Sequence, residues 1–274
     1  MRGEAEQNCI NIIRKIKDIE NPKRYFGFLR EDVEEIVEYI KNAQPNTKSS
    51  VFPDFMCNNG FIEHFRITSS KENKKGSVHI KKETFFKKKV ESEAERIKEQ
   101  WNQDMDDFKN HSTHWAFKFP EHSYNYLCES FKNNWENHIA SLNSYKGNKD
   151  TSIFMIEYTD LALTMYENVF EDWIDGLSNG DIREPEMVEF YRISRDKKLL
   201  NYIYQFRNTI KYVIFVYGKE YEAIKLNNIP YLLKLMPWDY VIAPYMGTTM
   251  ISSLYEIGRF NPYMEGDIES EQNK

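Results

Sequence analysis

Two short and almost continuous apolar runs, Ile153–Tyr158 and Tyr212–Tyr217, constrain the fold of this chain more than any other feature. Each run has the length of a strand, and a strand that is apolar on both faces is typical of a sheet covered on both sides. Helical patterns alternate with these runs, at about 160–177 and 197–208. This order predicts an α/β protein with a mixed central sheet flanked by helices.

The N-terminal part of the chain predicts two amphipathic helices followed by a β-hairpin. Isoleucines recur at helical spacing over 5–20, and a second apolar stripe covers 30–43. The pattern then changes to a short strand at 50–55, an Asn-Asn-Gly turn and a longer strand at 61–69. Asn-Gly between two apolar runs is a strong hairpin signal. The remaining predicted segments are helices at 90–110 and 122–144 and short strands at 223–226 and 240–243.

Composition excludes several classes of protein. The chain has 274 residues, of which 41% are hydrophobic and 29% charged, as in an ordinary globular protein. No apolar run approaches the roughly 18 residues that a membrane span needs. The polar N-terminus lacks the apolar stretch of a signal peptide. We therefore expect a cytoplasmic protein with no membrane partner, folded as a single domain over 1–265 with a polar tail at 266–274.

The cysteines are too few and too far apart for a disulfide framework or a cysteine zinc site. They are Cys9, Cys57 and Cys128. Among the histidines, His111 and His114 have a spacing that a metal could use, with His122 downstream, but no glutamate follows in the pattern of a zinc hydrolase. A solvated or capping role is the expectation for these histidines.

The net charge of −6 is unevenly distributed along the chain. Residues 71–89 hold eight lysines against two glutamates, a local charge of +6, so the remainder of the chain carries −12. A segment with this positive charge could bind the phosphate backbone of a nucleic acid, although blocks of like charge are also common as solvated surface. The lysines expected to contact nucleic acid are Lys74, Lys75, Lys81, Lys82, Lys87 and Lys88.

The predicted hairpin carries two carboxylates in apolar surroundings. Alternation along the second strand puts Glu63 on the face of Phe61 and Phe65, and His64 on the opposite face. A buried carboxylate needs a cation, a metal or hydrogen-bond donors, because its desolvation costs several kcal/mol. Asp54 lies on the neighbouring strand, so the two carboxylates could share one divalent ion. Hard oxygen ligands suit magnesium or manganese.

This arrangement resembles the PD-(D/E)XK nuclease superfamily. The motif of that family is an aspartate on one strand and, after a turn, an acidic residue, any residue and a lysine. Here Pro53-Asp54 matches the first part and Glu63-His64-Phe65 occupies the second. The resemblance covers about residues 30–70 and implies a restriction-endonuclease-like core with helical additions.

The resemblance also implies residues that would complete the site. In the family a glutamate from a preceding helix often joins the metal ligands, and Glu34 lies nearest the edge of the apolar stripe of 30–43. Phe65 stands where the motif has lysine. Lys71 is an expected basic group for this role, but Lys81, Lys82 or Arg66 could also supply it, and the sequence does not choose among them.

The resemblance implies a metal-dependent hydrolysis of phosphodiester bonds in DNA, with Mg²⁺ or Mn²⁺ held by Asp54 and Glu63 and with restriction or phage defence as the context. A catalytically inactive nuclease fold that binds nucleic acid or a protein is the alternative. Besides DNA, the partners we consider are a second copy of the chain or another protein. The purely structural interpretation is that Asp54 caps a turn and that Glu63 pairs with Arg66 or with a lysine of the neighbouring strand. Glu157, in the apolar run 153–158, is expected at a strand end near Asp160 rather than in the same site.

Overall fold

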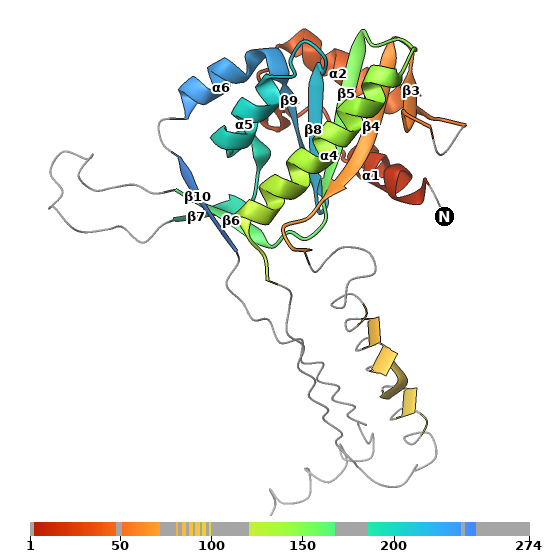
Figure 1. Ribbon diagram of the computed structural model, residues 1–274, viewed down its shortest axis with the longest axis vertical. Helices are drawn as coiled ribbons and strands as arrows, with labels where there is room; N and C mark the ends of the chain where they lie inside the picture. Colours follow the sequence, from red (N-terminus) through yellow and green to blue (C-terminus); the bar gives the residue numbers. More distant parts are fainter. Residues whose placement is uncertain are drawn as a thin grey trace, which may run out of the picture. The chain divides into compact units, whose positions relative to one another are not determined.

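Figure 1 shows the computed structural model of the chain. The described residues are 3–47, 51–71, 121–167, 186–236 and 239–244, with separate positions between 81 and 99. Contacts divide the chain into two compact units: Met1–Lys71 with His122–Tyr245, and Glu72–Glu121 with Met246–Lys274. Both sheets belong to the first unit.

The main sheet is seven-stranded and mixed, in the order β1-β9-β8-β5-β4-β3-β2. Its strands are β1 (Tyr25–Phe26), β2 (Gln44–Pro45), β3 (Phe55–Cys57), β4 (Gly60–Ile67), β5 (Thr151–Tyr158), β8 (Tyr212–Tyr217) and β9 (Glu220–Lys225). β4, β5 and β8 run parallel at the centre, whereas β3 pairs antiparallel with β4 and β9 with β8. The predicted α/β class and mixed central sheet are therefore confirmed.

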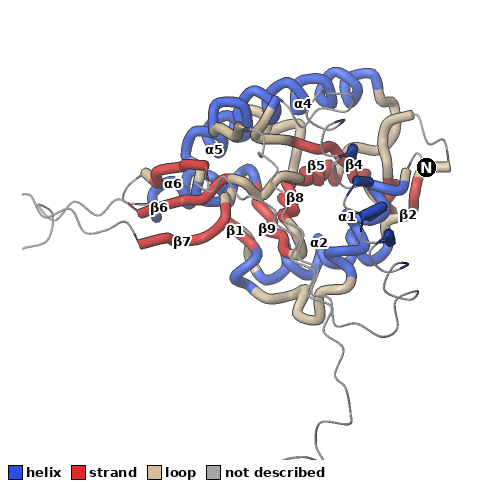
Figure 2. Tube along the Cα trace, turned by 90° about the horizontal axis from the view of Figure 1, so that it is seen from below, coloured by secondary structure: helices blue, strands red, loops and turns tan. Residues whose placement is uncertain are grey.

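Helices cover both faces of this sheet (Figure 2). They are α1 (Glu4–Arg14), α2 (Arg30–Asn42), α4 (Tyr124–Ser144), α5 (Lys197–Tyr204) and α6 (Ile229–Leu235). One core cluster joins α4, α5 and α6 to the sheet through side chains such as Phe65, Phe154 and Trp135. The other joins α1 and α2 to the opposite face through Ile62 and Met155. Successive residues of β4 and β5 thus point to different helical layers, as the strand period requires.

A close approach of backbone fixes the start of β4. A Cβ atom on Gly60 would lie 1.8 Å from the carbonyl oxygen of Thr151, at the start of the neighbouring strand. The backbone N–H of Thr151 donates to the carbonyl of Asn59 at 3.0 Å. The glycine of the Asn-Asn-Gly turn therefore allows β4 and β5 to begin side by side, which sets the register of the site residues downstream.

Several predicted elements match the structure and others differ in their limits. The strands at 153–158 and 212–217 and the helices at 30–43 and 122–144 are confirmed. The first hairpin strand begins at Phe55 instead of residue 50. The N-terminal helix ends at Arg14 rather than 20, because Ile19 lies in a loop whose carbonyl accepts a hydrogen bond from the Tyr221 hydroxyl at 2.8 Å.

The helix predicted at 160–177 is wrong over the described residues. Leu163–Glu167 is strand β6, which pairs antiparallel with β10 (Tyr240–Pro244) and β7 (Glu186–Phe190) in a second, three-stranded sheet. Leu163 and Met165 pack into the core cluster on the α4 face. This segment forms a strand rather than a helix because it pairs with β10, which lies far along the chain.

The lysine-rich segment is described at separate positions only. All described positions between 81 and 99 are helical, and Lys81 and Lys88 are exposed. Lys74, Lys75, Lys82 and Lys87, the histidines His111 and His114, and the tail at 266–274 lie outside the described residues. None of the helices in the described ranges is both long and apolar enough to cross a membrane.

Candidate functional site

Asp54 and Glu63 meet at the open end of the β3–β4 hairpin. β3 begins at Phe55, which pairs with Ile62, so the ladder between these strands stops one residue before Glu63. The other edge of β4 stays paired with β5 to Ile67. Backbone groups at this end of β4 therefore need partners other than a neighbouring strand on the β3 side.

The two side chains take the place of the missing ladder. The backbone N–H of Asp54 donates to Glu63 Oε2 at 3.0 Å, and the backbone N–H of His64 donates to Asp54 Oδ2 at 2.8 Å. Each carboxylate thus accepts from the main chain of the opposite strand. A carboxylate oxygen has two lone pairs, so these bonds leave acceptor capacity on both side chains for a cation.

A histidine from α4 completes this cluster. His138 Nδ1 lies 2.7 Å from Glu63 Oε1, and its ring stacks on Phe65 with centroids 4.8 Å apart and planes 17° apart. Phe65 stands where the resembled motif has lysine. The imidazole of His138 therefore brings a nitrogen-containing side chain to Phe65, the position where the motif has a lysine.

The electrostatics of the pair are those of two crowded carboxylates. Burial and the charge of Glu63 raise the pKa of Asp54 from 3.8 to about 6, against the opposing effect of the His64 N–H. The Glu63 side chain is only 8% exposed. A divalent cation between two such groups would offset both the desolvation and the repulsion.

Two other predicted site residues lie in different surroundings. Glu34 on α2 has a side chain 64% exposed and pairs with Arg30 at 3.3 Å. The ammonium of Lys71 lies 4.5 Å from the centroid of the Tyr126 ring. Within the described part of the chain, neither residue forms a hydrogen bond or ion pair with Asp54 or Glu63, so their assignment to the site stays a prediction from sequence.

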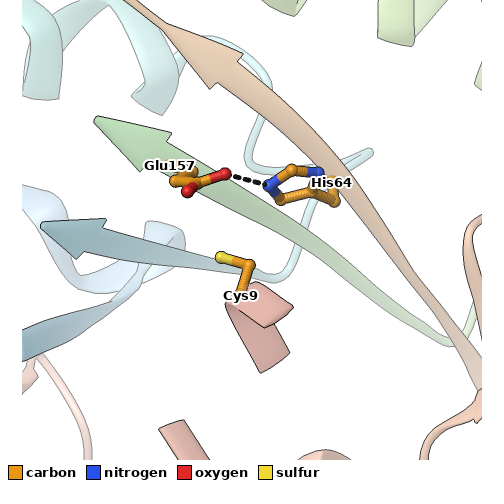
Figure 3. A group of neighbouring side chains, drawn as sticks. All are labelled: Cys9, His64 and Glu157. Carbon is orange, nitrogen blue, oxygen red and sulfur yellow. Dashed lines mark hydrogen bonds and ion pairs between the residues drawn. The ribbon is translucent and has the colours of Figure 1, made fainter. Parts of the chain in front are cut away.

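A second polar cluster occupies the opposite face of β4. It combines Cys9 of α1, His64 of β4 and Glu157 of β5, whose ligand atoms lie within 4.8 Å of one another. His64 Nε2 is 3.1 Å from Glu157 Oε2 (Figure 3). Among the described residues, this is the one group of three such side chains close enough to hold a metal ion. Glu157 is the next-to-last residue of β5, at the strand end and outside the Glu63 site as expected, and its side chain contacts His64 and Arg66.

Charges around this second cluster are balanced by Arg66. Its Nε donates to Glu157 Oε2 at 2.6 Å, so Arg66 pairs with Glu157 and not with Glu63. Burial alone would raise the pKa of Glu157, but the bonds from His64 and Arg66 outweigh it and hold the pKa below its ordinary value. Burial, and after it the charges of Glu157 and Glu6, raise the pKa of the Cys9 thiol.

Of the three histidines His111, His114 and His122, the last lies within the described residues and has a structural role. His122 Nδ1 lies 2.8 Å from the hydroxyl of Ser69 and 3.7 Å from Asp160 Oδ2. Ser69 is fully buried, and its backbone N–H also donates to Asp160. These bonds tie the segments after β4 and β5 together just before α4 begins.

Sequence reasoning missed His138 and Cys9. His138 shares the buried stripe of α4 with Phe131, Trp135 and Leu142, and Cys9 lies beside the buried Ile10 of α1. A polar or ligating side chain within an apolar helical stripe is the signal that would have marked both residues. It does not tell which strand residue is the partner.

Comparisons with known proteins identify no relative of this chain. No protein-family model matches the sequence, and no curated protein and no solved structure is significantly similar to it.

Proposed function

We propose that this chain is a divalent-metal-dependent nuclease of the PD-(D/E)XK type that hydrolyses phosphodiester bonds in DNA. The observation that carries the proposal is the pair of carboxylates, Asp54 and Glu63, brought together at the open end of the hairpin. Each is held by the main chain of the other strand, and among the described residues neither pairs with a lysine or an arginine.

The order of elements around this pair supports the proposal. A helix, α2, precedes the hairpin, and α4 connects the hairpin strand β4 to the parallel strand β5. This α/β order is compatible with the resemblance seen in the motif. Fold-level likeness alone does not imply an activity, so the weight rests on the carboxylates.

The donor set fits magnesium or manganese. Mg²⁺ is commonly held by one or two carboxylates together with water and substrate phosphate. Asp54 and Glu63 would hold the ion, whose charge would help to ionise a water and offset negative charge on the phosphate. Glu63 is oriented for this by the Asp54 N–H on one oxygen and by His138 on the other.

His138 is proposed to supply the nitrogen base that the motif lacks at Phe65. Its imidazole is fixed by two contacts, the hydrogen bond to Glu63 and the stack on Phe65. In that position it orients the Glu63 carboxylate and adds a proton-exchanging group beside the pair. Lys71 lies against Tyr126 instead.

The test is cleavage of plasmid and linear DNA by the full chain with Mg²⁺ or Mn²⁺. Asp54→Asn and Glu63→Gln remove the charge and keep an oxygen to accept the backbone N–H bond; in Glu63→Gln the amide nitrogen replaces the oxygen that faces His138. We expect each to lower the rate by about 100-fold or more, because the lost electrostatic stabilisation is worth several kcal/mol at about 1.4 kcal/mol per tenfold.

Glu129→Gln is the matched control, since it removes a carboxylate from an exposed position of α4. Wild-type rates in Asp54→Asn and Glu63→Gln, with both variants folded, would reject the site. An equal loss in Glu129→Gln would show that the loss is not specific to this pair and would also reject the site.

Phe65 specifically favours a second candidate function, a nuclease fold that binds DNA without cutting it. A phenyl ring can neither orient a water nor offset charge on a leaving group. This alternative expects salt-dependent DNA binding by the full chain, with no cleavage under either metal and the same affinity in Asp54→Asn.

A further inference from the structure

The strongest unassigned feature is the cluster of Cys9, His64 and Glu157 on the α1 face of the sheet. These residues come from three separate elements, and none of their side chains takes part in the proposed carboxylate site. Figure 3 shows the thiol of Cys9 directed toward the His64–Glu157 pair, and the three ligand atoms lie within 4.8 Å of one another. Cys9 is fully buried, and the His64 side chain is 3% exposed.

We propose that Cys9, His64 and Glu157 form a binding site for one zinc-class transition-metal ion, with water as the fourth ligand. Sulfur, imidazole nitrogen and carboxylate oxygen are the donors that Zn²⁺ takes in proteins, whereas magnesium prefers oxygen alone. Three protein ligands leave one position of a tetrahedron open. The site shares no side chain with the proposed nuclease centre and takes a different class of metal.

The spacing of the donors is close to what the ion needs. Tetrahedral zinc with ligands at 2.0–2.3 Å separates neighbouring donors by about 3.4–3.6 Å. His64 Nε2 and Glu157 Oε2 are 3.1 Å apart, and no pair in the cluster exceeds 4.8 Å. Side-chain rotations that close about 1 Å therefore suffice, with no change in the register of β4 and β5.

Arg66 is the competitor for this position. Its Nε lies 2.6 Å from Glu157 Oε2, the same oxygen that contacts His64. The Arg66 side chain is 52% exposed, so the guanidinium can turn into solvent when a metal cation replaces it. The Glu157 side chain, 20% exposed, marks the side from which an ion would enter.

Glu6 gives an independent indication of a missing ligand. It lies one turn before Cys9 on α1, and its Oε2 is buried without a hydrogen-bond partner among the described residues. An unpaired buried carboxylate oxygen is costly. A metal-bound water would donate to it, as outer groups do around metal sites.

The test uses the untagged full-length chain, stripped of metal by a chelator and titrated with Co²⁺, which takes the ligands of Zn²⁺. We expect one Co²⁺ per chain, a thiolate-to-cobalt charge-transfer band and the visible bands of four-coordinate cobalt. Added Zn²⁺ should remove these bands and raise the melting temperature. Excess Mg²⁺ should leave them unchanged.

Cys9→Ser should abolish the charge-transfer band, and Glu157→Gln should weaken Co²⁺ binding by about tenfold or more. Cys57→Ser is the matched control and should behave as wild type. A wild-type protein without the band, a band kept in Cys9→Ser, or displacement of Co²⁺ by Mg²⁺ overturns the site. If Cys9→Ser does not fold, an unchanged Co²⁺ affinity of Glu157→Gln overturns it. The DNA cleavage result has no bearing on these outcomes.

Discussion

His64 takes part in both clusters through different atoms. Its backbone N–H fixes the carboxylate of Asp54, and its imidazole lies on the opposite face with Cys9 and Glu157. A strand allows this division because the main chain bonds in the plane of the sheet while the side chain points out of it. A displacement of β4 at this one residue would therefore disturb both proposed sites.

Asp54 has a structural role that can be separated from its charge. Asp54→Ala leaves the buried N–H of His64 without an acceptor and should destabilise the fold by about 1–3 kcal/mol. Asp54→Asn keeps an accepting oxygen and removes the repulsion with Glu63, so its stability should equal or exceed that of wild type in chelator. Urea unfolding measures both, and equal losses in the two variants would contradict the assigned hydrogen bond.

His138 should matter for cleavage more than for stability. His138→Gln retains a donor for Glu63 but lacks the ring that stacks on Phe65 and exchanges a proton. We expect a fall in cleavage rate of about 10- to 100-fold, in the range of a lost acid–base or orienting group, with a changed pH profile. Asn137→Gln, at the exposed neighbouring position of α4, is the control. An unchanged rate and pH profile in His138→Gln would remove the residue from the site.

The candidate site was only partly predictable from the sequence. Alternation along β4 correctly put Glu63 and His64 on opposite faces, because the strand period is local. The demand for a partner of the buried Glu63 was also correct. The partner itself, His138, lies 75 residues further along the chain on a helix, and no local rule pairs a helix position with a strand position.

Among the helices and strands, those determined by the local sequence pattern were predictable, whereas those that depend on long-range strand pairing were harder to predict. The runs that became β5 and β8 were predictable because a continuously apolar strand has few places in a fold other than the centre of a sheet. β6 was not, since its identity depends on pairing with β10, and Leu163↔Pro244 partners are far apart in sequence. β7 and the two-residue strands β1 and β2 carry too little periodicity to be detected.

The attachment of α2 to the sheet should be sensitive to acid. Lys225 Nζ lies 2.7 Å from Asp32 Oδ1, and Asp32 also accepts from the backbone N–H of Leu29 at the start of the helix. Burial would raise the pKa of Asp32, but the bonds from Lys225 and Leu29 outweigh it and lower the pKa below 3.8.

A carboxylate with a lowered folded-state pKa stabilises the fold above its unfolded pKa and loses that contribution as pH falls through the folded value. Lys225→Met should therefore cost about 1–3 kcal/mol near neutral pH, with the difference from wild type shrinking below about pH 4. Urea unfolding between about pH 7 and pH 3 measures this. Lys219→Met, at an exposed position, is the control, and a difference that grows in acid would contradict the pairing.

At the scale of the molecule, the charge is divided along the chain. The lysines of 71–89 give +6 against −12 elsewhere, so the net charge of −6 is no argument against a phosphate-containing partner. The described positions of this segment, including Lys81 and Lys88, are helical and exposed to solvent. A contact between these lysines and DNA stays a prediction, and the salt dependence of DNA binding tests it.

Neutralising Lys81, Lys82, Lys87 and Lys88 to glutamine should weaken DNA binding and flatten its salt dependence. Each lysine that contacts a phosphate contributes a slope of about −0.9 in log affinity against log salt. The quadruple variant should thus lose between about one and four units of slope. Lys219→Gln with Lys234→Gln, at exposed positions, is the matched control. An unchanged slope would exclude this segment from the DNA contact.

Anomalous X-ray diffraction from crystals of the full chain soaked in Mn²⁺ would show whether Asp54 and Glu63 together bind a divalent cation. We expect a manganese peak within about 2.6 Å of a carboxylate oxygen of each residue, absent from crystals of Asp54→Asn. A peak held by other residues, or no peak beside this pair at saturating Mn²⁺, would contradict it.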